Sequence, residues 1–112
     1  MSRSPTAFEQ RVYAALRRIP RGRVVTYKAL ALYVECGSCR AVGQALHRNP
    51  FAPEVPCHRV IASDLTVGGF QGQRSGQALE SKLRLLKAEG VRFAGRRLAE
   101  PARVWNFHGD LF

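Results

Sequence analysis

Acidic residues are scarce in this chain of 112 residues, which carries eight Asp and Glu side chains against eighteen Lys and Arg. The formal net charge at pH 7 is therefore +10. Residues 1–59 hold ten basic and three acidic side chains, and residues 60–112 hold eight and five, so the excess lies mainly in the first half. Such a charge indicates a polyanionic partner such as nucleic acid, or else a merely soluble basic protein.

Long apolar runs are absent, since none approaches the roughly 18 residues that a membrane-spanning helix needs. The N-terminus also lacks the apolar core of a signal peptide. We therefore expect a cytoplasmic protein with no membrane partner. With 46% hydrophobic residues, the chain is long enough for one modest core and too short for two, so residues 1–112 are expected to form a single domain.

Cysteines are few, and their number of three is odd. Without an export signal, this argues against a disulfide framework. Cys36 and Cys39 do form a Cys-x-x-Cys pair, which is compatible with half a zinc site or a redox pair. A zinc site needs two more ligands, and the other candidate ligands show no matching second half: His47, Cys57, His58 and His108. We therefore expect no metal and no cofactor.

Three helices are predicted in the first half. Thr6 and Glu9 have the spacing of a capping box, and apolar residues recur at helical spacing to Ile19, which predicts a helix over 6–19. Thr26 can cap a second helix from Tyr27 to about Val34. After a turn, Ser38 can cap a third helix over 39–48. Two short helices joined by a glycine-containing turn form a helix-turn-helix.

The second half is predicted to hold a short buried strand at Val60–Ala62 and a fourth helix over 78–89. Leu79, Leu83 and Leu86 form the apolar face of this helix, and Lys82, Arg84 and Lys87 mark its solvated side. Trp105, Phe107 and Phe112 of the C-terminal tail are expected to pack on the body of the domain. The predicted fold is mostly α, a helix-turn-helix (winged-helix-like) domain with a short β element.

The third predicted helix presents small side chains, Ser38, Ala41 and Ala45, with Gly43 and Gln44 beside them. Small residues permit close approach to a backbone or a narrow groove, which favours the minor groove of DNA over the major groove. The alternative is that they pack against another helix. The two interpretations are equally compatible with the spacing.

Cys57 is a candidate nucleophile, in a buried Pro-Cys-His-Arg segment preceded by prolines that deny the approach regular helix. The thiolate is the reactive form, and His58 and Arg59 supply a base and a cation that can increase its population. Adjacent residues of an extended segment point to opposite faces, so His58 is expected to act through a water or a backbone bend. The alternative is an inert, buried cysteine.

Six segments together resemble the DNA-binding, catalytic domain of the O6-alkylguanine-DNA alkyltransferases, over roughly residues 6–93. They are Val25-Thr26-Tyr27, Arg40-Ala41-Val42-Gly43, Asn49-Pro50, Pro56-Cys57-His58-Arg59-Val60, Gly68-Gly69-Phe70-Gln71-Gly72 and Leu85-Leu86-Lys87-Ala88-Glu89-Gly90. The Pro-Cys-His-Arg-Val run is the most specific. The resemblance implies that an alkylated guanine is rotated out of the duplex and that its alkyl group passes irreversibly to Cys57.

The resemblance also assigns roles to single residues. Arg40 would fill the gap left in the base stack, and Tyr27 would donate to the departing guanine. His58 would accept the thiol proton through a water, Glu89 would orient His58, and Asn49 would brace the turn beneath the cysteine. The remaining predicted DNA contacts are Thr26, Ser38, Cys39, Ala41, Gly43 and Gln44, and the predicted pocket residues are Val55, Pro56, Val60, Gly68, Gly69, Phe70 and Gln71.

The partner implied is double-stranded DNA containing O6-alkylguanine, bound by a monomer. Phe70 and Gln73 stand where this family commonly has tyrosine and glycine. The short build and the Trp-containing tail are similar to the alkyltransferase-like proteins, which bind the lesion without a cysteine and recruit nucleotide excision repair. A lesion sensor of that kind is the alternative function, and a helix-turn-helix transcription regulator is a third.

Overall fold

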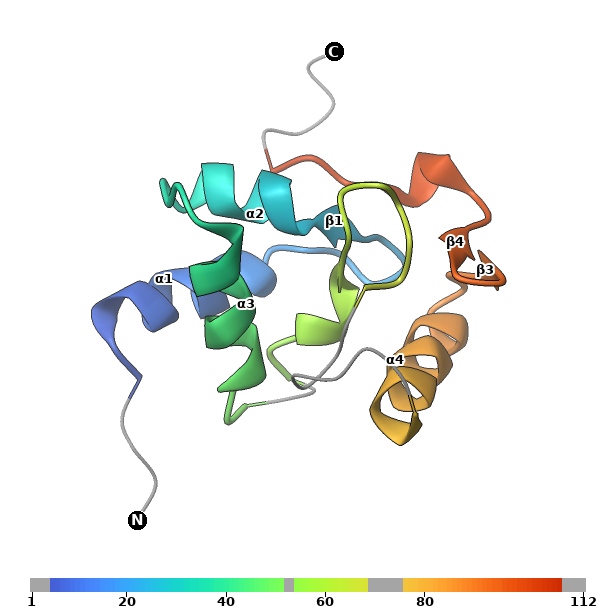
Figure 1. The fold of residues 1–112 in the computed structure, drawn as a ribbon, viewed down its shortest axis with the longest axis horizontal. Coiled ribbons are helices and arrows are strands. Elements are labelled where there is room, and N and C mark those ends of the chain that lie inside the picture. Colours follow the sequence, from blue (N-terminus) through green and yellow to red (C-terminus); the bar gives the residue numbers. More distant parts are fainter. Residues whose placement is uncertain (1–4, 52–53, 69–75, 108–112) are drawn as a thin grey trace.

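The computed structural model describes residues 5–51, 54–68 and 76–107. Four α-helices dominate the described chain, with two pairs of two-residue strands between and after them (Figure 1). The helices are α1 (Ala7–Leu16), α2 (Tyr27–Tyr33), α3 (Cys39–His47) and α4 (Gln77–Ala88); the strands are β1 (Val25–Thr26), β2 (Val60–Ile61), β3 (Phe93–Ala94) and β4 (Arg97–Leu98). The predicted mostly α-helical fold is confirmed, and no described helix is long and apolar enough to cross a membrane.

Helix α1 begins at the predicted capping box. Thr6 Oγ1 accepts a hydrogen bond from Glu9 N at 3.1 Å, and Thr6 N donates to Glu9 Oε1 at 2.9 Å. The helix ends at Leu16, three residues before the predicted Ile19, because the chain continues in tighter turns in which Ile19 N bonds Leu16 O. Ile19 is nevertheless buried as expected.

Helices α2 and α3 form the predicted helix-turn-helix. Thr26 and Ser38 are the helix caps, since their hydroxyl oxygens accept from the backbone N of Ala29 and Ala41, each at 3.1 Å. The turn between the helices includes Glu35 in a left-handed conformation, with φ 58°. Six apolar side chains of this unit are buried in the main core: Leu30, Ala31, Val34, Val42, Ala45 and Leu46.

Ala45 is on the inner side of α3, which corrects the prediction that it belongs to the outward small-residue face. Its side chain is buried, and its carbonyl accepts a 2.8 Å hydrogen bond from the Tyr13 hydroxyl of α1. Helix packing therefore explains one of the three small residues. Ser38 is exposed and Ala41 is half-buried. Of the three small residues, only these two, at the cap and in the first turn of α3, can face outward.

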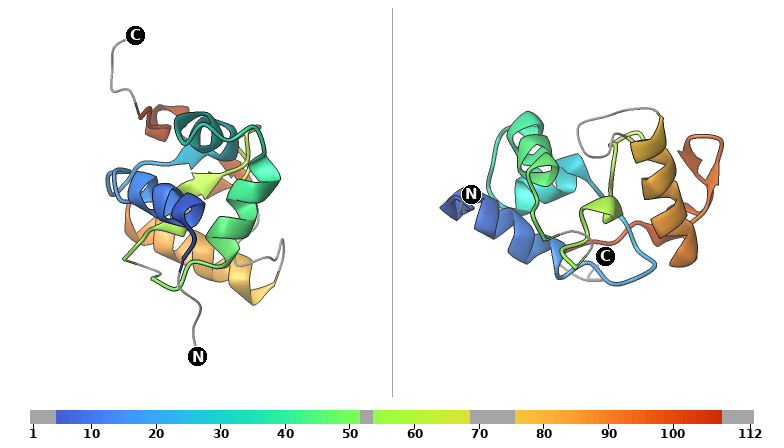
Figure 2. Two further views of the ribbon diagram at one scale, coloured as in Figure 1. Left: turned by 90° about the vertical axis from the view of Figure 1, so that its left-hand side faces the viewer. Right: turned by 90° about the horizontal axis from the view of Figure 1, so that it is seen from below.

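Strands β1 and β2 lie side by side in parallel, with Val25 opposite Val60 and Thr26 opposite Ile61. Val25, Val60 and Ile61 are buried and Thr26 is half-buried, and the strands lie at the centre of the molecule, with α1 and α3 to one side and α4 to the other (Figures 1 and 2). This pairing fixes the chain that precedes β2, which contains Cys57, relative to the start of α2.

The C-terminal segment packs on this body, as predicted for Trp105 and Phe107. The ring of Phe107 stacks on that of Tyr33, with centroids 4.3 Å apart, and Trp105 meets Phe107 edge-on at 5.1 Å. Trp105 N also donates to Val24 O at 2.7 Å. The prediction for Phe112 lies outside the described residues.

Helix α4 turns its apolar stripe inward, and Lys82 lies on that stripe, not on the solvated side as predicted. The side chain of Lys82 is fully buried. Its Nζ donates to the backbone oxygens of Val60 and Val67, both at 2.6 Å. A buried amine is tolerated here because strand β2 and the chain after it present carbonyls to it.

Candidate active site

Cys57 follows a tight turn centred on Pro56. The backbone N of Cys57 donates to Val55 O at 2.9 Å, and Pro56 has φ −83° and ψ 71°, which are the angles of an inverse γ-turn. The proline ring fixes φ and thereby favours this turn. A 3₁₀ turn over Cys57–Arg59 then leads directly into β2.

Asn49 ties this turn to the end of α3. Its Nδ2 donates to Val55 O at 2.8 Å, and its Oδ1 accepts from Phe51 N at 2.9 Å. The carbonyl of Val55 thus accepts from both Asn49 and Cys57. Asn49 therefore contacts the turn beneath the cysteine, as predicted.

Cys57 is buried, with 7% of its surface exposed. Burial raises the pKa of its thiol, and the opposing influences of Asn49 and of the charge on Lys82 do not offset it. The resting cysteine is therefore a thiol near neutral pH. Arg59 was expected to favour the thiolate of Cys57. Its guanidinium is bound to Glu89 instead and does not activate the thiol.

His58, Arg59 and Glu89 form one buried cluster. His58 Nε2 lies 3.0 Å from Glu89 Oε2, and Arg59 donates through Nη2 to the same oxygen at 2.7 Å and through Nε to Oε1 at 2.9 Å. Burial raises the pKa of Glu89, but the hydrogen bonds from Arg59 and His58 outweigh it and bring the pKa to about 2. Glu89 is therefore a carboxylate at neutral pH, held in place by a two-point contact with Arg59.

The cluster defines the protonation of His58. Burial lowers the pKa of His58, and Glu89 opposes this only partly, so the ring is neutral near pH 7. Because the Glu89 carboxylate can only accept, the single ring proton resides on Nε2. Nδ1 then carries a lone pair, and this atom is buried with no hydrogen-bond partner among the described residues. A neutral imidazole with a free Nδ1 lone pair can act as a base.

Lys82 is the residue of this region that the sequence interpretation missed. Its charge lowers the pKa of the Cys57 thiol and thereby favours the thiolate. Burial in turn lowers the pKa of Lys82 to about 7. The sequence contains a signal, since Leu79, Lys82 and Leu86 lie at the i, i+3 and i+7 positions of one helix face.

The depressed pKa of Lys82 predicts a pH dependence of stability. Between the folded value of about 7 and the ordinary value of about 10.4, the unfolded chain binds more protons, so the free energy of unfolding rises with pH. We expect an increase of about 1–2 kcal/mol between roughly pH 7 and pH 8.5. The neutral amine keeps two N–H donors for Val60 and Val67, so deprotonation does not cost these bonds.

Urea unfolding at a series of pH values checks this expectation. Lys82→Met should lack the increase, whereas Lys87→Met, which removes an exposed lysine of the same helix, should keep it. The measurements should stop below about pH 9. Above the ordinary pKa of a thiol, the raised pKa of Cys57 makes the free energy of unfolding fall with pH and so opposes the effect of Lys82. Equal slopes for wild type and Lys82→Met would contradict the assignment.

Tyr27 is the first residue of α2 and lies half-buried beside Lys82 and Gly68. Lys82 Nζ is 6.0 Å from the centre of its ring. Gly68 has φ +71°, and a Cβ at this position would lie 3.4 Å from Tyr27 Cε2, so glycine permits the close approach. Of the other predicted pocket residues, Val55, Pro56 and Val60 are buried, and Gly69, Phe70 and Gln71 lie outside the described residues.

Arg40 is exposed in the first turn of α3, and Gln44 is exposed one turn later. Ser38, Ala41 and Gly43 share this part of the helix, and the backbone of Cys39 begins it. The predicted DNA contacts thus belong to one helix and its cap, with Thr26 at the start of α2. Among the described residues no cluster of three His, Cys, Asp or Glu side chains could hold a metal.

Comparison with known proteins gives one consistent family. The family model for the 6-O-methylguanine DNA methyltransferase DNA-binding domain matches residues 7–91. A methylated-DNA–protein-cysteine methyltransferase of Methanothermobacter thermautotrophicus is 43% identical over 91 residues, which are 81% of this chain and 48% of that protein. A DNA base-flipping protein of Thermus thermophilus is 49% identical over 82 residues, 72% of this chain and 51% of that protein.

The solved structures include a protein of similar size. The S. pombe Atl1 structure, a complex with damaged DNA containing O6-carboxymethylguanine, superposes with a TM-score of 0.75 at 32% identity. The match covers 93% of this chain and 99% of Atl1. By contrast, the chain spans about half the length of the two curated relatives above.

Proposed function

Because this chain belongs to the 6-O-methylguanine DNA methyltransferase family, we propose that it binds duplex DNA in the minor groove, rotates an O6-alkylguanine out of the stack and accepts its alkyl group on Cys57. The reaction is irreversible, since its product is a thioether. Each molecule therefore acts once. We make this proposal for the present chain, which corresponds to about half the length of the Methanothermobacter methyltransferase.

One observation carries the proposal more than any other: Cys57 is buried next to His58, whose Nε2 faces the ionised Glu89 and whose Nδ1 has no hydrogen-bond partner in the described part of the chain. A lesion-binding role alone does not require a thiol beside a base. Transfer requires both, because the resting Cys57 is protonated and its proton must leave as the sulfur attacks.

In the proposed step, the methyl group moves from guanine O6 to the sulfur of Cys57. The Cys57 thiol proton passes through a water to His58 Nδ1, and the resulting imidazolium is stabilised by Glu89. The sulfur attacks the methyl carbon, the S–C bond forms, and the bond between that carbon and guanine O6 breaks. Tyr27 donates a proton or a hydrogen bond to the guanine as it leaves. The charge of Lys82 favours the transient thiolate.

A lesion sensor is the second candidate, favoured by the similarity to Atl1 over nearly the whole of both chains. In this function the protein would hold the rotated base and recruit nucleotide excision repair, with Cys57 unreactive. The two functions share the DNA-binding surface of α2 and α3. They differ in what happens to the alkyl group and in whether other repair proteins are recruited.

Analysis of the DNA tests the proposal and separates these functions. A duplex with one O6-methylguanine is incubated with increasing amounts of protein, digested, and assayed for the modified nucleoside. We expect the lesion to disappear in a one-to-one ratio with protein and to stop there. A lesion that survives excess protein, while the protein still prefers the damaged duplex in a gel shift, would reject transfer and favour the sensor.

Arg40 is predicted to stabilise the complex in which the guanine is rotated out of the base stack, more than binding to undamaged duplex. It is exposed at the N-terminal turn of α3, where it can enter the stack in place of the displaced base. Rotating a base costs a few kcal/mol, so Arg40→Ala should weaken binding of the O6-methylguanine duplex roughly tenfold and binding of the undamaged duplex much less. Fluorescence anisotropy measures both. Lys28→Ala, which removes an exposed cation of α2, should weaken both equally; equal losses for Arg40→Ala would make Arg40 a phosphate contact.

A further inference from the structure

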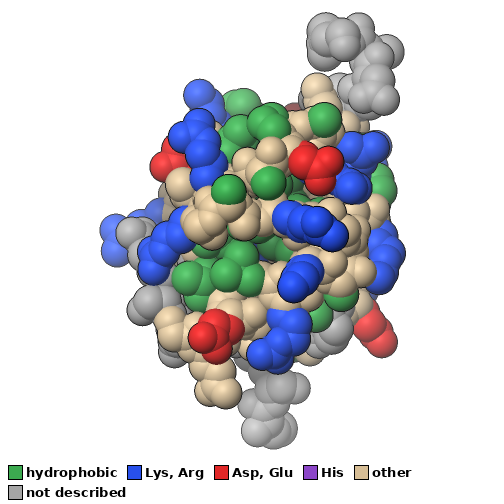
Figure 3. All heavy atoms as spheres, turned by 90° about the vertical axis from the view of Figure 1, so that its right-hand side faces the viewer, with side chains coloured by type: hydrophobic (Ala, Val, Ile, Leu, Met, Phe, Trp, Pro, Cys, Tyr) green, Lys and Arg blue, Asp and Glu red, His purple; other side chains and the backbone are tan. Residues whose placement is uncertain are grey.

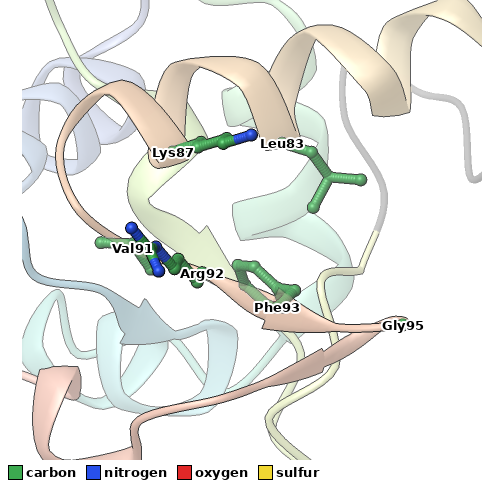
Figure 4. A pocket seen from close by; sticks show the side chains of 6 residues that line it. All are labelled: Leu83, Lys87, Val91, Arg92, Phe93 and Gly95. Atoms are coloured by element: carbon green, nitrogen blue, oxygen red, sulfur yellow. The ribbon is translucent and has the colours of Figure 1, made fainter.

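A second concave site lies between α4 and the hairpin of β3 and β4. It has a volume of about 480 Å³, within the range of known ligand sites, and is lined by Leu83, Lys87, Val91, Arg92, Phe93 and Gly95. Figure 4 shows Leu83 extending from α4 toward the hairpin and Phe93 extending from the hairpin toward α4. We call it the α4–hairpin pocket.

Local backbone structure forms this pocket. Gly90, with φ +87°, ends α4 and turns the chain back, and Val91 N bonds Leu86 O at 2.9 Å. Val91 and Leu86 are buried, so the base of the hairpin is anchored to the helix. Gly95, at φ +63°, makes the hairpin turn and adds no side chain to the rim. The pocket is thus preformed by packed elements.

The charge of the pocket has one sign. Lys87 and Arg92 are exposed at its wall, and neither side chain forms a salt bridge or hydrogen bond with another residue of the described ranges. None of the lining residues is acidic. Figure 3 shows the side of the molecule that carries the hairpin, where Lys and Arg side chains, together with some Asp and Glu, lie around hydrophobic ones. An anionic partner is therefore favoured.

The apolar lining distinguishes among anions. Leu83 and Phe93 are half-buried, which leaves part of each in water beside the two cations. Phosphate groups of DNA would pair with Lys87 and Arg92 but would gain nothing from this apolar surface. An apolar side chain flanked by carboxylates uses both features, because a buried anchor in a pocket with a polar rim is how protein interfaces gain most of their affinity.

The position of the pocket leads to the same conclusion. In Figures 1 and 2, α4 and the hairpin lie across the molecule from α3, the helix proposed to contact DNA. A duplex seated on α3 leaves the α4–hairpin pocket open. From its shape, charge and placement, we propose that this pocket docks an acidic segment of a partner protein, which inserts one apolar side chain between Leu83 and Phe93.

The probe for this proposal is a fluorescein-labelled peptide of about twelve residues, with one phenylalanine between runs of Asp and Glu. Binding is measured by anisotropy and mapped by amide chemical-shift changes. We expect saturable binding, with the largest shifts at Leu83, Lys87 and residues 91–93. Lys87→Ala with Arg92→Ala should weaken it roughly tenfold, and Arg84→Ala, which removes an exposed charge of α4 outside the pocket, should change it little.

Two further controls identify the source of binding. The same peptide with serine in place of phenylalanine should bind much more weakly, and the double variant should bind the O6-methylguanine duplex as wild type does. No saturation at about millimolar peptide, equal binding of the serine peptide, or shifts centred on α3 would each overturn the proposal. A loss of duplex affinity matching the loss of peptide affinity would make the pocket a DNA phosphate site and overturn it as well. None of these readouts depends on alkyl transfer.

Discussion

Cys57→Ala is expected to abolish alkyl transfer completely and to leave binding of the O6-methylguanine duplex intact. The sulfur of Cys57 is the proposed acceptor, and no other thiol can replace it in the same turn. The variant should still fold, because the turn depends on backbone and Asn49 contacts: Cys57 N to Val55 O at 2.9 Å and Asn49 Nδ2 to Val55 O at 2.8 Å. Only a small side chain is lost from the core.

Nucleoside analysis of the DNA and anisotropy with the intact duplex measure the two properties separately. Cys36→Ala is the matched control, since Cys36 is a free cysteine of the turn between α2 and α3 and has no proposed role. It should repair the lesion as wild type does. Repair that survives in Cys57→Ala, or is lost in Cys36→Ala, would remove Cys57 from the acceptor position.

Glu89→Gln is expected to have the second-largest effect, on both stability and rate. The Glu89 carboxylate is 7% exposed and neutralises Arg59, whose side chain is 15% exposed, at 2.7 Å. Removing one member of such a pair leaves a largely buried charge uncompensated, which costs roughly 3–5 kcal/mol. Glu100→Gln is the control, because the Glu100–Arg103 pair is 3.7 Å apart and much more exposed; its loss should cost about 1 kcal/mol or less.

The effect on rate follows from the proton on His58. The carboxylate of Glu89 can only accept, and it therefore keeps the ring proton on Nε2 and the lone pair on Nδ1. A glutamine amide can instead donate to Nε2 and place the proton on Nδ1. Since a wrong tautomer removes the base, single-turnover transfer should slow roughly a hundredfold or more. Lesion affinity should change far less, because Glu89 is not among the proposed DNA contacts.

The pH dependence gives an independent check on Glu89. Its pKa in the folded protein is about 2, below the ordinary value of about 4.3, so its stabilisation is complete above that ordinary value and is lost as pH falls toward 2. Wild type should therefore lose about 3 kcal/mol of stability across this range through Glu89 alone. In denaturant unfolding, the stability of Glu89→Gln should fall less than that of wild type as pH decreases toward 2. Equal decreases for the two proteins would contradict the pairing of Glu89 with Arg59 and His58.

Local signals predicted the helical part of this fold well. Thr6, Thr26 and Ser38 were identifiable as caps because their hydroxyls satisfy backbone groups a few residues away, which is a property of short sequence windows. The same holds for the helix-turn-helix. The predicted end of α1 at Ile19 was wrong, because the chain continues beyond Leu16 in tighter turns. The predicted outward position of Ala45 was wrong as well, because it depends on how α1 packs against α3, as in the contact from Tyr13 to Ala45.

The site was only partly predictable. A cysteine after Pro56 pointed to a nucleophile, and the resemblance to a known family implied that Glu89 orients His58. That Arg59 pairs with Glu89, instead of lowering the pKa of Cys57, depends on contacts between residues 30 positions apart. The sequence predicts Lys82 on the solvated side of α4, because a lysine is rarely buried. Only the folded chain brings the carbonyls of Val60 and Val67 to its amine.

The parallel pairing of β1 and β2 was likewise beyond the sequence pattern. Each strand has two residues, too few to show an alternation of apolar and polar positions. A strand is predicted at residues 60–62, but nothing in that segment specifies residues 25–26 as its neighbour. The α2–α3 connection between them makes the pairing possible, since parallel strands need a long crossover.

The mass of the protein after reaction distinguishes alkyl transfer to Cys57 from lesion binding alone. Wild type is incubated with a duplex containing O6-methylguanine, its intact mass is measured, and the modified residue is located by peptide mapping. We expect one methyl group per molecule, in place of the thiol hydrogen of Cys57 and on no other residue. An unchanged mass under conditions in which the damaged duplex is fully bound would contradict it and leave a lesion sensor with an unreactive cysteine.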